Sequence, residues 1–475
     1  MDIYNVYDFV GPNGYFFNAL DYSLIDDLHK IDFVFNNNTI DFLQKKHDVI
    51  SSFSHEIFSK NNICVYDINN SNKNVIYFYN LHTNGNLKHF LGMNKQSETI
   101  RNSGFEYISE TAINYLKNTD NFYITLYSGI ENELDKYDIV NLYKECMDYN
   151  IPRNKIIFLS NILDSKKILN RFYNKFKIYN QKEFIFYNFN EQLLFKGDEL
   201  VNSQNSNLFV SENLNINHKK NKCLFLNRRL RPHRLFILSL LANDNLLDNN
   251  LISFDLEYDD TSYFESYIRD NHYIRIDEYF KSDDIQKKII DDITLKKVLN
   301  GFKIIKKINK KSLDVNNFNS IEGRSLEVDA KYLYENSYFS LVGETEFFDD
   351  WKDYTTEKIL KPIQQLHPFV VVGRPHILKD LKSYGFKTFS EFWDESYDDE
   401  DNNSNRIKKV YSTIDNLINK SFLEWEDMYI RLKPILIHNK KVLEKYAGIS
   451  TRKKIEKNII NLLSNESIQN HQRIL

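Results

Sequence analysis

The sequence predicts an α/β protein of two domains, and three observations support this fold class. The chain has 475 residues, which exceeds what one hydrophobic core usually serves, so two domains of about 200 residues each are expected. Short apolar, β-branched and aromatic runs alternate with segments of helical periodicity, which indicates βαβ units and largely parallel sheets. A polar, low-complexity stretch over residues 202–221 indicates a connection between the domains.

We therefore expect an N-terminal α/β domain over residues 1–218, a C-terminal α/β domain over residues 219–420, and C-terminal helices over residues 421–475. Ligands in such sheets bind at the carboxyl ends of the strands, so functional residues are sought where strands end. In the first domain, strands are predicted at residues 31–35, 62–66, 74–79, 122–127, 155–159 and 183–187, and helices at 137–149 and 165–176. In the second, strands are predicted at 222–226, 251–254, 338–342, 368–372 and 387–389, helices at 233–241, 284–299, 356–366 and 377–384, and an acidic surface loop at 394–405.

Composition and charge narrow the class of protein. The 62 basic and 66 acidic residues leave a formal net charge of −4, which provides no global basic field for nucleic acid or an anionic membrane. Cys64, Cys146 and Cys223 lie too far apart to suggest a disulfide framework or a metal knuckle. The N-terminus has no signal-peptide pattern, and no apolar run of about 18 residues occurs. We expect a cytoplasmic protein with no integral membrane association.

An arginine-rich turn follows the strand predicted at residues 222–226 and opens a helix. Its sequence is NRRLRPHR, which contains Asn227, Arg228, Arg231 and Arg234. The first N–H groups of a helix are unpaired and favour anions. Arginine adds forked donors that match phosphate oxygens. The turn therefore predicts a diphosphate site, while a solvated basic surface and a nucleic-acid patch are the alternatives.

A second polar segment follows the strand predicted at residues 338–342, which delivers Glu344 to its carboxyl end. Thr355 or Thr356 is placed to cap the next helix, with Glu357 and Lys358 in its first turn. A lysine there is locally unfavourable for the helix dipole, and a bound anion would explain it. Glu357 can accept hydrogen bonds from ribose hydroxyls, and Lys358 can reach a phosphate. The alternative is a capping box with a surface lysine.

The run DYTTEKILKPIQQLHPFVVVGRP, residues 353–375, resembles the signature of family 10 fucosyltransferases. In those GT-B enzymes a Tyr-x-x-Glu-Lys run precedes a helix and then a Pro-Val-rich strand that ends in Gly. Val-Gly-Glu-Thr stands here where the family has Phe-Glu-Asn, and Arg234 matches the arginine that opens the helix after the first C-terminal strand. The resemblance covers residues 222–389. It implies a GT-B-like fold, with two Rossmann-type domains, a cleft between them and C-terminal helices that cross back.

The resemblance also implies roles for individual residues. Tyr354 would line the nucleotide base, Glu357 would bind the ribose, and Lys358 and Arg234 would bind the diphosphate. Thr345 replaces the family's asparagine. The implied reaction is an inverting, metal-independent transfer of fucose or a similar sugar from a nucleoside-diphosphate sugar, with GDP-fucose the favoured donor and no further cofactor. The acceptor stays open among a glycan, a protein, a lipid and a modified nucleobase.

In the family that the chain resembles, the catalytic base comes from the N-terminal domain. The strand predicted at residues 122–127 ends in Ser-Gly-Ile-Glu, where the small pair allows close approach to a ligand. Glu131 at this end is the expected base, with Glu133 as the second candidate. A helix cap is the structural alternative for Glu131.

Two weaker features are candidates for the acceptor side. Gly11 and Asn13 lie in a turn-rich loop after a short strand, and a plain turn is the simpler interpretation of this loop. Asn161 follows the strand predicted at residues 155–159, so it is expected at the same edge of its sheet.

Two rival functions remain open from sequence. A nucleic-acid-binding protein would use the arginine cluster at residues 228–234, with stacking from an aromatic content of 15%. A metal-dependent GT-A glycosyltransferase would need an Asp-x-Asp-like pair, for which Asp255 and Glu257 are the candidates. Salt-dependent binding of DNA or RNA would support the first, and loss of activity in EDTA the second.

Overall fold

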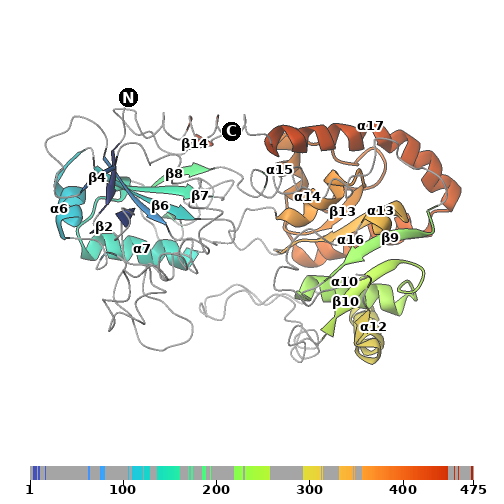
Figure 1. Ribbon diagram of the computed structural model, residues 1–475. Coiled ribbons are helices and arrows are strands. Elements are labelled where there is room, and N and C mark those ends of the chain that lie inside the picture. Colours follow the sequence, from blue (N-terminus) through green and yellow to red (C-terminus); the bar gives the residue numbers. More distant parts are fainter. Residues whose placement is uncertain are drawn as a thin grey trace. The chain divides into compact units, whose positions relative to one another are not determined.

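The computed structural model divides into two compact units (Figure 1). The first comprises Met1–Gln192, Asp350–Tyr354 and Ile449–Leu475, and the second Leu193–Asp349 and Thr355–Gly448. The predicted domain limit at residue 218 lies outside the described residues and stays a prediction. The structure describes residues 4–7, 9–10, 16–17, 62–64, 75–80, 105, 110–120, 122–128, 136–160, 170, 173–174, 184–188, 193, 219–227, 230–256, 292–311, 313, 331–345, 347, 356–447, 454, 458 and 472–473.

The first unit contains a parallel sheet of seven described strands. Its elements are β1 (Tyr4–Tyr7), β4 (Asn62–Cys64), β5 (Val75–Asn80), α6 (Glu110–Asn118), β6 (Phe122–Ser128), α7 (Lys136–Asp148), β7 (Ile156–Ser160), β8 (Ile185–Asn188) and β14 (Gln472–Arg473), beside a hairpin of β2 (Phe9–Val10) and β3 (Phe16–Phe17). The strand order is β14-β8-β7-β6-β5-β1-β4, and each neighbouring pair is parallel. Strand β14 comes from the C-terminal end of the chain, which therefore returns to the first unit.

The second unit contains a five-stranded sheet. Its elements are β9 (Asn221–Leu226), α10 (Pro232–Asn243), β10 (Leu251–Asp255), α12 (Asp292–Ile308), β11 (Lys310–Lys311), α13 (Lys331–Glu335), β12 (Ser337–Gly343), α14 (Glu357–Gln364), β13 (Phe369–Val372), α15 (Ile377–Ser383), α16 (Asn403–Asn419) and α17 (Phe422–Ala447). The order is β11-β10-β9-β12-β13, and only β11 is antiparallel to its neighbour. Counted along the chain this is 3-2-1-4-5, the order of doubly wound nucleotide-binding sheets. The direction of the strand order reverses between β9 and β12.

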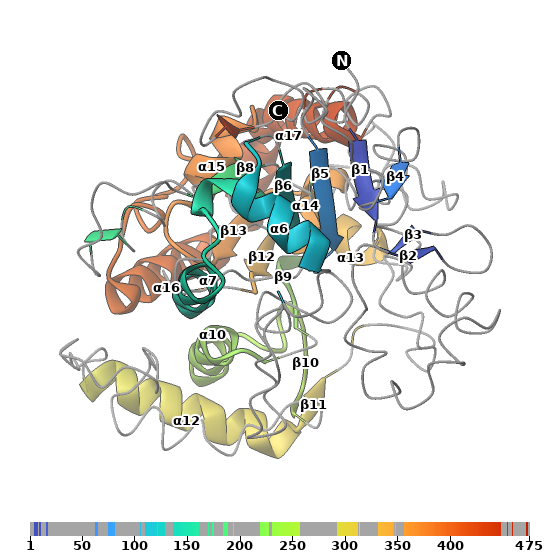
Figure 2. The same cartoon turned by 90° about the vertical axis from the view of Figure 1, so that its left-hand side faces the viewer.

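The core of the second unit explains why these segments fold as they do. Every residue of β12 and of β13 is buried, as expected for parallel strands covered on both faces. Helix α10 is buried on all sides, and α12 lies against it (Figure 2). Gly301 of α12 permits this approach, because a Cβ there would lie 1.7 Å from the backbone oxygen of Ser239. The two helices are therefore packed with their backbones close together.

Most of the strands and helices predicted in the second unit are confirmed within two residues, but the strand at residues 387–389 is wrong. Among the described residues, no strand pairs with this segment. Instead, Asn439 of α17 binds both backbone groups of Lys387: its Oδ1 accepts from the N–H at 2.7 Å, and its Nδ2 donates to the carbonyl at 2.8 Å. A side-chain amide thus takes the place of a partner strand.

Two other boundaries differ from the prediction. Helix α12 continues to Ile308, well past residue 299, and the predicted surface loop at 394–405 ends where α16 begins at Asn403. That loop is also not wholly on the surface, because Glu395 and Asp398 are buried. Both carboxylates accept hydrogen bonds from backbone N–H groups, at 2.7–3.0 Å, which compensates for their burial. The strand predicted at residues 31–35 lies outside the described residues.

Within the described part of the chain, none of the helices has both the length and the apolar character needed to cross a bilayer. Cys146 and Cys223 are buried free thiols. Helix α17 belongs to the second unit, whereas residues 449–475 after it belong to the first.

Candidate functional site

Asn227 marks the carboxyl end of β9, beside the point where the strand order reverses. The register pairs Leu224 with Ser340, which places Asn227 opposite Gly343 at the end of β12. Its backbone N–H donates to the Ser253 oxygen at 3.2 Å and its Nδ2 to the same oxygen at 3.4 Å. The Oδ1 atom is buried and has no hydrogen-bond partner among the described residues. Asn227 thus offers an acceptor at the position where ligands of such sheets bind.

Arg234 in the first turn of α10 reaches across to β12. Arg231 is the N-cap of this helix and Pro232 its first residue, a position that suits proline because no N–H is needed there. The Arg234 side chain passes over Gly343, where a Cβ would lie 2.9 Å from its Cγ. Its Nη2 then donates to the Glu344 backbone oxygen at 2.9 Å. A glycine at the strand end is what lets the guanidinium lie here.

His233 shares the same carbonyl group. Its Nε2 lies 2.8 Å from the Glu344 oxygen, which can only accept, so Nε2 carries the hydrogen. Burial, together with Arg234, lowers the pKa of His233 well below its ordinary value, and the imidazole is therefore neutral at pH 7. The ring stacks on Phe347, with 5.2 Å between centroids and 12° between planes. His233 therefore fixes the segment after β12 without adding charge.

The first turn of α14 approaches the same strand end. The Glu344 carboxylate is buried, and its Oε2 accepts from the Thr345 N–H at 3.2 Å and from the Thr356 hydroxyl. Thr356 is the N-cap of α14, and its oxygen accepts from the Lys358 N–H at 3.4 Å. The Lys358 ammonium donates to Thr345 Oγ1 at 3.1 Å, to Thr356 Oγ1 at 3.3 Å and to Glu357 Oε1 at 3.1 Å. Two threonine hydroxyls thus hold a lysine at a helix N-terminus.

Glu357 and Lys358 form a partly exposed ion pair, with 30% and 31% of their side-chain surfaces exposed. Burial alone would raise the pKa of Glu357, but Lys358 and Lys361 outweigh it and lower that pKa from its ordinary value. The carboxylate is therefore ionised at neutral pH, and it can only accept hydrogen bonds.

The two helix N-termini converge on neighbouring residues. Arg234 contacts Glu344, and Lys358 contacts Thr345, so cations from distant parts of the sequence meet at the end of β12. Each cation lies in the first turn of a helix, where unpaired N–H groups also attract anions. This arrangement suits an anion that carries more than one phosphate.

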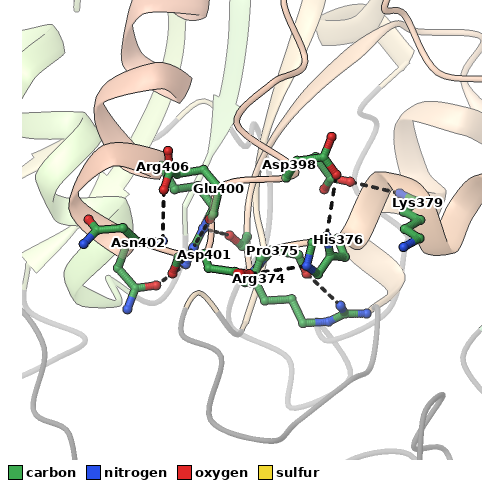
Figure 3. A network of polar contacts seen from close by, with 12 residues as sticks. Arg374, Pro375, His376, Lys379, Asp398, Glu400, Asp401, Asn402 and Arg406 are labelled. Atoms are coloured by element: carbon green, nitrogen blue, oxygen red, sulfur yellow. Dashed lines mark hydrogen bonds and ion pairs between the residues drawn. The ribbon is translucent and has the colours of Figure 1, made fainter. Parts of the chain in front are cut away.

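Arg406 of α16 secures the strand ends of this sheet (Figure 3). Its Nε donates to the Gly373 oxygen at 3.1 Å, and its Nη1 donates to the Glu400 oxygen at 2.8 Å. Its Nη2 bonds the Phe347 oxygen, and its Cζ lies 4.4 Å from the centroid of that ring. Phe347 is therefore held between Arg406 and His233. Sequence reasoning missed Arg406, because no local pattern distinguishes it from other helical arginines.

A second set of contacts follows β13 (Figure 3). The buried Arg374 pairs with Asp380, and His376 adopts a left-handed backbone conformation with φ of 64°. The His376 N–H donates to the Asp398 oxygen at 2.7 Å. The Asp398 carboxylate caps α15, accepting from the backbone N–H groups of Leu378 and Lys379 at 2.9 and 3.0 Å. These contacts hold the loop that Arg406 also binds.

Not all of the predicted site residues can be placed. Those that the structure brings to the ends of β9 and β12 are Asn227, Arg234, Glu344, Thr345, Thr356, Glu357 and Lys358. Arg231 lies beside them as an exposed N-cap. Gly11, Asn13, Glu131, Asn161, Arg228 and Tyr354 lie outside the described residues.

The candidate metal pair is only partly visible. Asp255 forms an ion pair with Lys310 at 2.6 Å, and Glu257 lies outside the described residues. In the described ranges, no three or more His, Cys, Asp or Glu side chains are grouped to hold a metal ion.

The chain was compared with known proteins. No protein-family model matches it, and no curated protein sequence does. Among solved structures, one described as "OtsA apo structure" is similar over 81% of this chain and 73% of that chain, with 10% identity and a TM-score of 0.36. A likeness this distant carries no argument about function, which therefore rests on the geometry of the site itself.

Proposed function

We propose that the chain is a glycosyltransferase that binds the diphosphate of a nucleoside-diphosphate sugar at the first turns of α10 and α14. The observation that carries the proposal is the convergence of Arg234 and Lys358 on the adjacent residues Glu344 and Thr345. The sheet order 3-2-1-4-5 supports it, because ligands of such sheets bind where the strand order reverses.

The proposed chemistry follows from the charge of the leaving group. When the bond between the sugar C1 and the phosphate oxygen breaks, its electron pair stays on the diphosphate. Arg234, Lys358 and the helix N–H groups stabilise that charge. Glu357, as an ionised acceptor, is proposed to bind the ribose hydroxyls, and Tyr354 to line the base. Cations supplied by the protein would make a metal unnecessary.

The finer assignments rest on the sequence. We propose inversion by direct displacement, in which the acceptor oxygen attacks C1 and Glu131 takes the proton from the acceptor hydroxyl. GDP-fucose is the favoured donor because residues 353–375 resemble family 10 fucosyltransferases. Gly11, Asn13 and Asn161 stay proposed as acceptor-side residues.

A ligand screen by thermal shift tests the proposal, with GDP, UDP, ADP, CDP and their sugar conjugates, each with and without EDTA. A ligand at 100 times its Kd stabilises the folded state by about 2.7 kcal/mol, which gives a measurable shift. We expect a response to one nucleoside diphosphate that EDTA does not change. A response only to metal-loaded nucleotide would instead favour the Asp255 and Glu257 alternative.

Substitutions then test the two cations. Lys358→Met is expected to weaken nucleoside diphosphate binding at least tenfold, because a charge-assisted bond to phosphate is lost. Arg234→Ala should do the same. Lys379→Ala, an exposed lysine on α15, is the matched control and should bind as wild type. Wild-type affinity in Lys358→Met would defeat the site assignment.

Nucleic-acid binding is the alternative from a different class. Nucleic acid binds to an exposed basic surface, and of the two described arginines of the cluster Arg231 is exposed whereas Arg234 is buried. The exposed Arg231 would have to act with Arg228 and Arg229, which lie outside the described residues. Salt-sensitive binding of DNA or RNA, with no response to any nucleotide, would favour this alternative.

A further inference from the structure

The Lys358 ammonium is held by two hydroxyl groups that share one anchor. Thr345 Oγ1 lies 3.1 Å and Thr356 Oγ1 3.3 Å from Lys358 Nζ. Both residues also bond the Glu344 Oε2 atom, Thr345 through its backbone N–H and Thr356 through its hydroxyl. Glu344 therefore does not contact the Lys358 ammonium directly. Its carboxylate acts on Lys358 through the two threonines.

The direction of the Thr356 hydroxyl decides what it can do for Lys358. A threonine hydroxyl has one hydrogen to donate and two lone pairs to accept with. Because the hydrogen goes to Glu344, the oxygen presents only lone pairs to the backbone N–H and the ammonium of Lys358. Without the carboxylate, the hydrogen would be free to turn toward the ammonium and repel it.

The cost of burying Glu344 also points to a role beyond stability. Its side chain is 1% exposed, and its Oε1 has no hydrogen-bond partner among the described residues. A buried carboxylate with one unsatisfied oxygen is expensive to keep. Its contacts are with Thr345 and Thr356, which are the residues that hold Lys358. Lys358 itself is about one-third exposed, with the partly exposed Glu357 as its third partner.

We propose that Glu344 is a positioning residue that orients Thr356, and with it Thr345, so that their oxygens hold the Lys358 ammonium for a phosphate of the donor. Two of the three ammonium hydrogens stay on the threonines. The third, which Glu357 holds in the free protein, is the one that a phosphate oxygen takes. This inference rests on the proposed function, because it assigns the anion that Lys358 binds.

The test compares binding of GDP and guanosine by calorimetry, since only GDP carries phosphates. Thr356→Val keeps the shape of the side chain but loses the hydroxyl, and should weaken GDP binding about tenfold while guanosine binding stays unchanged. Thr356→Ser keeps the hydroxyl and should stay within about twofold of wild type. Glu344→Met has no oxygen to accept from the Thr356 hydroxyl, and should weaken GDP binding as Thr356→Val does, whereas Glu344→Gln can keep its amide oxygen at the Oε2 position and should stay closer to wild type.

A double-mutant cycle separates positioning from a general structural effect. In a Lys358→Met background, Thr356→Val should cause no further loss of GDP affinity, because the group it positions is gone. Thr413→Val is the matched control: Thr413 is a buried threonine of α16 whose hydroxyl bonds the Asp394 and Lys409 oxygens, far from the site in sequence. GDP binding should not change in that variant.

The outcomes distinguish this inference from the proposed function. Equal loss of GDP and guanosine, an unchanged effect of Thr356→Val in the Lys358→Met background, or wild-type GDP binding in Thr356→Val would each overturn the positioning role. If Lys358→Met loses GDP binding while Thr356→Val does not, the proposed site stands and only this inference fails. If Lys358→Met binds GDP as wild type does, the site assignment itself fails.

Discussion

The first turns of α10 and α14 each bring a cation to the end of β12, but they hold it by different means. Arg234 is 5% exposed and lies over Gly343, in a helix that is packed closely against α12. Lys358 is about one-third exposed and is held by hydrogen bonds to Thr345 and Thr356. One cation is placed by packing, and the other by a polar network.

This difference predicts how substitutions at the first turn of α10 and at the first turn of α14 affect stability and ligand binding. In a closely packed core, one side chain that no longer fits disturbs its neighbours as well. Substitutions around α10 should therefore lower both the free energy of unfolding and the affinity for the ligand. The hydrogen bonds of the partly exposed Lys358 contribute little net stability, so Lys358→Met should lower affinity with a smaller effect on the free energy of unfolding. The following variants test this contrast.

Gly301→Ala should have the largest effect. The added Cβ would lie 1.7 Å from the Ser239 backbone oxygen and 3.1 Å from the Asn243 nitrogen, so α10 and α12 would have to separate. We expect a loss of about 3 kcal/mol in the free energy of unfolding, measured in urea. Asn300→Ala, the exposed neighbour on α12, is the control and should be neutral or slightly stabilising. A Gly301→Ala variant as stable as wild type would contradict the close packing of α10.

Gly343→Ala tests the passage of Arg234 over the strand end. The Cβ would lie 2.9 Å from Arg234 Cγ and 3.1 Å from its Cδ and Nε. Because the arginine side chain can move, we expect a smaller loss of about 1–2 kcal/mol in unfolding free energy, together with weaker nucleoside diphosphate binding. Calorimetry and urea unfolding measure the two effects. Unchanged affinity would show that Arg234 does not need this position to bind phosphate.

The smallest expected change in the free energy of unfolding per residue is the one that pH causes through two buried histidines. Burial is the main cause that lowers the pKa of both His233 and His367 well below the ordinary value, aided by Arg234 and Lys219 respectively. Below about pH 6.5 the unfolded chain therefore binds protons that the folded protein does not. Stability should be full above that pH and fall as the pH drops, by about 1.4 kcal/mol per pH unit for each histidine.

Urea unfolding at pH 7.5, 6.5 and 5.5 measures this slope. His233→Gln should remove the part of the pH dependence that comes from His233, at the start of α10. His367→Gln should remove the part that comes from His367, which bonds the Ser337 oxygen at 2.7 Å and Ser340 Oγ at 2.8 Å on β12. The same slope in wild type and in both variants would contradict their burial as neutral imidazoles.

Local sequence patterns were sufficient for part of the site. The apolar spacing after an arginine-rich turn predicted within one residue where α10 begins, and a threonine followed by Glu-Lys predicted the start of α14, because helix periodicity and caps depend on near neighbours. Local propensity failed at residues 387–389, where Asn439 from α17 takes the backbone hydrogen bonds. A contact made from so far along the chain leaves no sign in a short window of sequence.

The sequence by itself determined that the second unit is α/β, that its strands are buried, and that Asn227 and Glu344 follow strand ends, because hydrophobic periodicity and capping are local properties. Only the tertiary structure decided that β9 and β12 are neighbours, so that Arg234 and His233 reach the same Glu344 oxygen. It alone also decided that Arg406 of α16 and His233 of α10 hold Phe347 between them. Strand order and packing depend on contacts between distant residues, and those are settled only when the whole core forms.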